Sequence, residues 1–121
     1  MVYKNTFLKI ADNTGPRYAK CLGIKKKSIG YLADIILVVI KKRFLKKKKI
    51  KKNILNSLVI NTRYKIKRKN GLFIRFNHNK SLLLNHQHVF LGSNVKAVIC
   101  REIKKFKKKF KKIISYSPGN I

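Results

Sequence analysis

The sequence is poor in acidic side chains, with only Asp12, Asp34 and Glu102 against 32 lysines and arginines. Each of the three suits a structural role, at a turn, at the start of a strand or at the start of a helix. Folding could bring two of them together, but no acid–base pair is visible in the sequence, so we expect no catalytic activity. The formal charge of +29 opposes compaction by self-repulsion. We therefore expect a polyanionic partner.

Cysteine is also scarce. Cys21 and Cys100 lie 79 residues apart with no second thiol beside either, which excludes a disulfide framework and a Cys-x-x-Cys metal site. We expect both to be small buried hydrophobic residues. His86 and His88 could bind a metal from one strand, but no third ligand is in view. Since glycine-rich phosphate loops and nucleophile elbows are also missing, we expect neither a cofactor nor a small-molecule substrate.

Long apolar runs are absent. The longest, Ile35–Ile40, has six residues, which is too short to span a membrane and suits a strand buried on both faces. The first residues already have the pattern of a strand followed by a turn. We therefore expect that a targeting leader has been removed or that the protein is made where it works. Heavy use of Lys, Ile and Asn is typical of an AT-rich coding sequence, which favours a compact organellar genome.

The clearest fold signal is the stretch 58–84. Apolar and polar residues alternate from 60 to 67, and the pair Asn70-Gly71 then turns the chain back. A two-residue loop would set core residues opposite charged ones. A three-residue loop at 69–71, with Gly71 in the left-handed conformation, instead pairs Ile66 with Ile74 and Tyr64 with Phe76. We expect the three-residue loop.

The other face of this hairpin carries positive charge: Arg63, Lys65, Lys67, Lys69 and Arg75, with Phe73 among them. Residues on one face of a strand recur every ~7 Å, which is on the scale of phosphate spacing in nucleic acids. Of the 32 basic residues, 23 fall in the blocks 41–52, 62–76 and 101–112. The first block fits neither a strand nor a helix face, so we expect an arm that becomes ordered against phosphate.

Four aromatic residues lie among these charges: Phe44, Tyr64, Phe73 and Phe106. They could stack on nucleic-acid bases. At strand and helix spacing, aromatic residues more often pack in a core or against lysine stems. Both interpretations stay open.

The remaining pattern predicts short strands followed by one helix. Expected strand segments are Thr6–Ala11, Tyr18–Ile24, Ile35–Ile40 and Ser81–Leu84, followed by a short apolar segment at Val95–Ile99, with a turn at Asp12, Asn13 and Gly15. A helical apolar stripe follows at Ile103, Phe106, Phe110 and Ile113, and Ser117–Gly119 ends it. We therefore expect one mainly β domain over 1–121, with a closed or nearly closed barrel over about 1–100 and a helical tail over about 101–116.

Several segments together resemble the universal large-subunit ribosomal protein fourteen family. Thr6–Gly15 is similar to its opening strand, which ends in Ala-Asp-Asn-Ser-Gly, and Cys21 stands where the family has a cysteine. Asn70–Asn77 follows its signature closely. Cys100–Ile103 and Phe110–Pro118 resemble its ending. The resemblance runs in order along nearly the whole chain.

The resemblance implies a five-stranded β-barrel with a short carboxy-terminal helical segment, bound to large-subunit rRNA at the face that meets the small subunit. Neighbouring large-subunit proteins three and nineteen, and bridges to small-subunit rRNA, are also implied. The implied rRNA-binding residues are Arg63, Lys65, Lys67, Arg68, Lys69, Arg75, Lys104, Lys105 and Lys108. The implied bridge residues are Lys46, Lys47, Lys48, Lys49, Lys51 and Lys52.

The chain departs from the family pattern at several positions. The family's glycine before Asp34 is Ala33, and its carboxylate after Phe76 is Asn77. Ser93-Asn94 replaces a Thr-Arg pair, which alters the surface that family members offer to a ribosome-silencing factor. Because several changes replace neutral or acidic groups with lysine or amides, we favour a mitochondrial ribosome in the matrix over a plastid ribosome.

Two rival functions follow from the same charge. One is a nucleoid-type DNA-binding protein. The other is a membrane-active cationic module built on the helix 102–114, although the barrel can cover the same apolar stripe.

Overall fold

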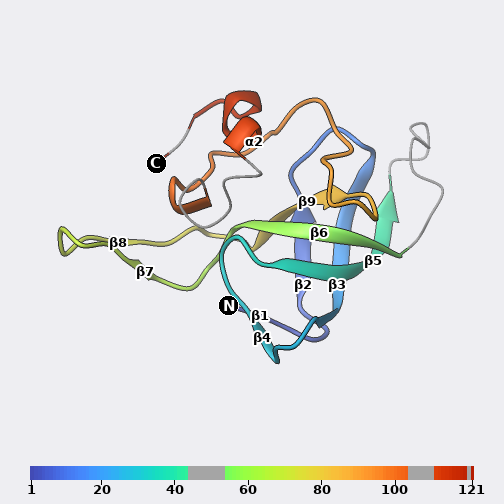
Figure 1. Ribbon diagram of the computed structural model, residues 1–121, viewed down its shortest axis with the longest axis horizontal. Helices are drawn as coiled ribbons and strands as arrows, with labels where there is room; N and C mark the ends of the chain where they lie inside the picture. Colours follow the sequence, from blue (N-terminus) through green and yellow to red (C-terminus); the bar gives the residue numbers. More distant parts are fainter. Residues whose placement is uncertain (44–53, 104–110, 120) are drawn as a thin grey trace.

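The computed structural model describes residues 1–43, 54–103, 111–119 and 121. Five strands form a closed barrel (Figure 1), in the order β2 (Phe7–Ile10), β3 (Pro16–Ile24), β5 (Ile35–Arg43), β6 (Ile54–Asn61) and β9 (Lys80–Leu84). Neighbouring strands are antiparallel except for β2 and β9, which pair in parallel and close the barrel. The predicted five-stranded barrel is confirmed.

One face of every strand fills the barrel interior. The residues of this inner core include Leu8, Ala19, Cys21, Ile36, Val38, Leu55, Val59 and Leu83. Strand β3 turns its small side chains inward, whereas Tyr18 and Lys20 on its other face are partly exposed. Cys21 belongs to this core and Cys100 is buried elsewhere, so both thiols are free and buried as expected.

A second core lies between the outer faces of β6 and β9 and the carboxy-terminal part of the chain. It joins Leu58, Ile60, Leu82 and Leu84 to Ala97, Ile99, Ile103 and Ile113. Strands β6 and β9 are therefore buried on both faces. The expectation that 35–40 is buried on both faces is wrong, because Leu37 on β5 is 42% exposed. The carboxy-terminal segment covers β6 and β9 instead of β5.

The central hairpin has the predicted register. Strands β7 (Ile66–Lys67) and β8 (Phe73–Ile74) pair Ile66 with Ile74. The Gly71 N–H donates to the Arg68 carbonyl over 3.1 Å, and the Arg68 N–H donates to the Leu72 carbonyl over 2.9 Å. Gly71 has a φ of 84°. The three-residue loop with a left-handed glycine is therefore confirmed.

The alternation from 60 to 67 predicts one continuous strand leading into the hairpin. The structure instead has two separate strands there. Strand β6 ends at Asn61, and β7 begins at Ile66. Instead of a ladder pair between Tyr64 and Phe76, the Phe76 N–H donates to the Thr62 carbonyl over 3.1 Å. The chain therefore bends where it leaves the barrel.

Two further elements complete the described fold. Strands β1 (Val2–Tyr3) and β4 (Ile29–Gly30) form a small sheet that the sequence did not predict. Helix α2 (Lys111–Tyr116) ends just before Ser117–Gly119, as expected. The middle of the predicted helix 102–114, with Phe106 and Phe110, lies outside the described residues.

Ala33 occupies a strained backbone position. It has a φ of 68°, is buried, and donates its N–H to the Val59 carbonyl over 2.9 Å. A side chain in this left-handed region costs about 1–2 kcal/mol relative to glycine. The glycine that the resemblance implies at this position would adopt the same conformation without this cost.

We predict that Ala33→Gly raises the free energy of unfolding by roughly 0.5–1 kcal/mol, because relief of strain exceeds the greater entropy of the unfolded glycine chain. Urea unfolding followed by circular dichroism measures this. Ala19→Gly is the matched control, since Ala19 is a fully buried strand residue without positive φ; it should be destabilised. Destabilisation of both variants would contradict the strain argument.

Candidate nucleic-acid interface

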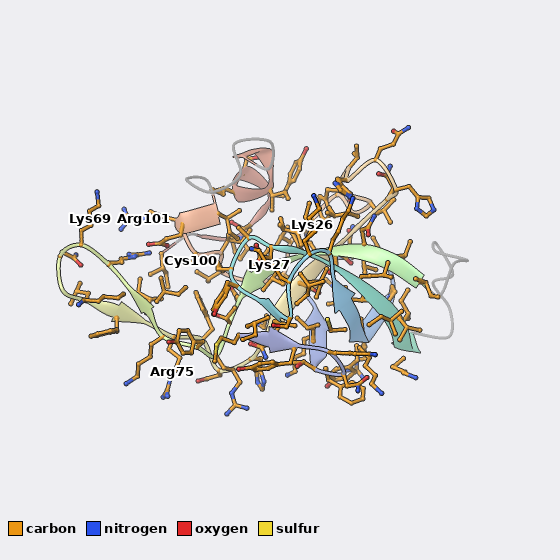
Figure 2. The ribbon with its side chains drawn as sticks, turned by 60° about the horizontal axis from the view of Figure 1, so that its bottom comes forward. Lys26, Lys27, Lys69, Arg75, Cys100 and Arg101 are labelled. Carbon is orange, nitrogen blue, oxygen red and sulfur yellow. The ribbon has the colours of Figure 1, made fainter. Side chains whose placement is uncertain are left out.

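The hairpin extends away from the barrel and exposes its cations. Figure 1 shows β7 and β8 projecting from the side of the barrel, and Figure 2 shows Lys69 at the far end of the hairpin and Arg75 nearer its base. The side chains on the predicted outer face are exposed: Arg63, Lys65, Lys67, Lys69 and Arg75. The arrangement is a ribbon of positive charge that solvent, or a polyanion, can reach from outside.

Two hairpin aromatics are exposed as well. Tyr64 is 53% exposed and Phe73 is 61% exposed, so neither is a core residue. The Lys65 Nζ atom lies 6.0 Å from the centroid of the Phe73 ring, which is weak cation–π packing. The lysine-packing interpretation therefore holds for Phe73.

Arg68, one of the expected rRNA-binding residues, makes contacts within the protein. Its Nε donates to Glu102 Oε1 over 2.6 Å, and its Nη2 donates to Glu102 Oε2 over 3.0 Å. The same nitrogen donates to the Ile121 carbonyl over 2.5 Å. The Nε and Nη2 donors, which could otherwise grip a phosphate in this forked geometry, are thus engaged by a carboxylate. Arg68 therefore ties the hairpin to the carboxy-terminal segment.

The Arg68 contact changes the ionisation of Glu102. Burial by itself raises the pKa of the carboxyl group, but hydrogen bonds from Arg68 and from the Cys100 thiol outweigh it and lower the pKa to about 2. Burial also raises the pKa of the Cys100 thiol. Glu102 is thus a structural anion, as expected, although its partner is an arginine 34 positions earlier in the chain.

The turn predicted at Asp12, Asn13 and Gly15 holds distant segments together. Asp12 is buried and accepts hydrogen bonds from the Thr14 N–H over 3.1 Å and the Leu83 N–H over 3.0 Å. The Asn13 side chain bonds Ser93 and Asn94. Gly15 has a φ of 117°. The turn therefore also positions the loop at 92–94.

A second group of cations was missed by sequence reasoning. Lys9 and Lys80 are partners in the parallel β2–β9 pair. Their charges and that of Arg63 act on His78: the charge of Lys9 lowers the pKa of the imidazole most, followed by desolvation and the charges of Lys80 and Arg63. Only the barrel closure brings Lys9 beside Lys80, so no local sequence signal could have found this group.

Several expected site residues fall outside the described part of the chain. These are Lys46, Lys47, Lys48, Lys49, Lys51, Lys52, Lys104, Lys105 and Lys108. Among the described residues, no three His, Cys, Asp or Glu side chains gather into a metal-binding group. Within the same residues, no helix has the length and apolar character needed to cross a membrane.

Comparison with known proteins identifies what this chain resembles. The family described as ribosomal protein L14p/L23e matches residues 1–121. A relative from Carsonella ruddii (strain PV), described as large ribosomal subunit protein uL14, is 36% identical over 120 residues, which is 97% of each chain.

The depressed pKa of Glu102 predicts a stability change in acid. Because the folded-state pKa of about 2 lies below the ordinary 4.5, ionised Glu102 favours the folded state. This contribution is complete above about pH 4.5 and is lost as the pH falls towards 2. We predict a loss of roughly 3 kcal/mol in the free energy of unfolding across this window.

Urea unfolding at a series of pH values measures this loss in the unchanged protein and in Glu102→Gln. The variant should be less stable near pH 6, and its stability should depend less on pH, because it lacks the titrating carboxyl group of Glu102. The other two carboxylates are common to both proteins and contribute equally to both curves. Parallel curves for the two proteins would rule out the Arg68–Glu102 pair as the source.

Proposed function

This chain belongs to the ribosomal protein L14p/L23e family, and on that premise we propose that its hairpin binds large-subunit ribosomal RNA through the phosphate backbone. Family membership makes the protein a structural constituent of the large ribosomal subunit and not an enzyme. The proposal adds which surface of the barrel carries the RNA and by what chemistry.

One observation supports this most directly: the exposed cations of the hairpin have no carboxylate competing for them. Asp12 is bound by Thr14 and Leu83, Asp34 by Tyr31 and Lys27, and Glu102 by Arg68. The chain contains no fourth acidic side chain. A surface of uniformly positive charge gains binding free energy from a phosphate backbone, because lysines and arginines that neutralise the phosphates release their counterions. Such contacts position the protein without reading base sequence.

The binding surface continues from the hairpin onto the barrel. Arg63 stands at the base of the hairpin, and its charge lowers the pKa of His78, as do the charges of Lys9 and Lys80. We include Lys9 and Lys80 in the RNA-facing set and remove Arg68 from it. Lys104, Lys105 and Lys108 stay in the set on the strength of the family alone.

The family also suggests the neighbours of this protein. We propose contacts with large-subunit proteins three and nineteen, and bridges to small-subunit rRNA made by Lys46, Lys47, Lys48, Lys49, Lys51 and Lys52. Replacing these six lysines with glutamine should weaken subunit joining in a sedimentation assay and leave large-subunit assembly intact. We further propose that a ribosome-silencing factor meets the loop at 92–94, where Asn13 holds Ser93 and Asn94.

The protein works in the ribosome, and we propose a mitochondrial ribosome on the basis of the AT-rich composition. The Carsonella relative is bacterial, which makes a bacterial ribosome the competing location. Mass spectrometry of ribosomes purified from separated mitochondria, plastids and bacterial cells of the source material decides between these locations. Recovery of the chain from bacterial ribosomes alone would remove the mitochondrial proposal.

A nucleoid-type DNA-binding role is the rival explanation of the charge. A filter-binding competition between duplex DNA and structured large-subunit rRNA at one salt concentration separates the two. We expect the rRNA to compete more strongly. A clear preference for the duplex DNA would favour the rival role.

The hairpin proposal predicts a steep dependence of RNA affinity on salt. Neutralisation of six to ten phosphates gives log affinity against log salt a slope of roughly −5 to −9. Replacing Arg63, Lys65 and Arg75 with glutamine should reduce the size of the slope by roughly 2–3, because about three phosphate contacts are lost. Fluorescence anisotropy with a labelled rRNA fragment at several salt concentrations measures both slopes.

A control variant removes the same charge elsewhere. Lys25, Lys26 and Lys96 are exposed and lie outside the hairpin, so replacing all three with glutamine should leave the slope close to that of the unchanged protein. Equal reductions in the two variants would mean that net charge, and not the hairpin, accounts for binding.

A further inference from the structure

A small cleft opens where the hairpin leaves the barrel. It has a volume of about 200 Å³, and its lining includes Tyr31, Leu32, Tyr64, Lys65 and Ile66. Tyr31 is 47% exposed and Tyr64 is 53% exposed, so the rings that line the cleft also face solvent. Figure 1 shows the amino terminus and the β1–β4 sheet on the same side of the barrel as the hairpin.

The cleft lies where the chain continues beyond the end of β6 and the carboxy-terminal segment no longer covers it fully. Ile60 on β6 is fully buried beneath the carboxy-terminal segment. Thr62, Tyr64 and Ile66 continue the same alternation beyond the end of β6, and all three line the cleft. Thr62 is buried and Ile66 packs against the second core, whereas Tyr64 is half exposed beside a row of cations, so of these three residues Tyr64 offers the open surface.

We propose that this cleft holds one unstacked nucleobase of the large-subunit rRNA, against the rings of Tyr64 and Tyr31. The inference rests on the proposed function and deepens it, since it adds a base contact to a surface otherwise proposed to bind only phosphates. Unpaired RNA bases are commonly held by stacking on aromatic side chains. Lys65 lies at the cleft, and Arg63 and Lys67 lie on the neighbouring exposed face. These cations would contact the phosphates on either side of that base.

Size and charge favour a base over other occupants. Pockets for drug-sized molecules usually measure ~300–1,000 Å³, so a cleft of about 200 Å³ suits a single planar ring system. Among the described residues that line this cleft, Lys65 has a positively charged side chain and Met1 brings the amino terminus. A neutral apolar side chain from another protein would gain nothing from this positive charge, whereas a nucleotide brings a phosphate that complements it.

The test uses Tyr64→Ala and Tyr64→Phe, with Phe73→Ala as the matched control, because Phe73 is an exposed hairpin aromatic that does not line the cleft. Each full-length protein is bound to large-subunit rRNA and incorporated into reconstituted large subunits. Base-specific chemical probing then reads which unpaired nucleotides are protected. Since Tyr64 is half exposed, its replacement should leave the thermal unfolding temperature nearly unchanged.

We expect Tyr64→Ala to expose at least one unpaired base that the unchanged protein, Tyr64→Phe and Phe73→Ala all protect. Loss of the stacking contact should weaken binding to an rRNA fragment containing that base by about 5- to 150-fold. The slope of affinity against salt should stay the same, because no phosphate contact is removed.

Two results would overturn the inference. One is an identical protection pattern in Tyr64→Ala and the unchanged protein, with salt-dependent RNA binding intact; this leaves the phosphate-binding function standing. The other is a crosslink from a photoreactive phenylalanine analogue at position 64 to a neighbouring protein and not to RNA. Failure of the unchanged protein to bind rRNA at all would instead count against the proposed function.

Discussion

The burial of β6 on both faces is the constraint on which the rest of the structure depends. Val59 belongs to the core inside the barrel, and Leu58 and Ile60 belong to the core beneath the carboxy-terminal segment. The strand is therefore held from both sides, and the chain bends after Asn61 to lead from it into the hairpin. Because each buried aliphatic side chain contributes about 1.5–3 kcal/mol, this strand gives the hairpin a rigid base. The Arg68–Glu102 ion pair attaches the hairpin to the carboxy-terminal segment at a second point.

The distribution of charge follows from the shortage of carboxylates. Each of the three acidic side chains makes a contact within the protein, and the cations on the outer face of the hairpin are exposed. Self-repulsion among these cations lowers the stability of the free protein, and phosphate neutralisation removes it. Under the proposed function, RNA binding would therefore stabilise the fold. The lowered pKa of Glu102 is consistent with this use of the acids, because the Arg68 guanidinium stabilises the ionised carboxylate.

Local sequence reasoning succeeded where short-range chemistry decides the structure. The register of the hairpin followed from pairing apolar with apolar residues, and the left-handed glycine at Gly71 followed from the loop length. It went wrong where a distant segment decides burial. The run 35–40 is as apolar as a doubly buried strand, yet the carboxy-terminal segment packs on β6 and β9, so Leu37 stays exposed. Alternation alone could not say that β6 ends at Asn61, and that Tyr64 lines an open cleft.

The sequence by itself determined the mainly β class, the hairpin and its exposed cations, and the family, because period-two alternation, turn residues and ordered motifs are all read along the chain. Only the tertiary structure decided that Arg68 turns to Glu102, that Lys9 meets Lys80, and which strands are covered twice. These contacts join residues far apart in sequence. Their partners are set by barrel closure and by packing of the carboxy-terminal segment, and no local pattern encodes them.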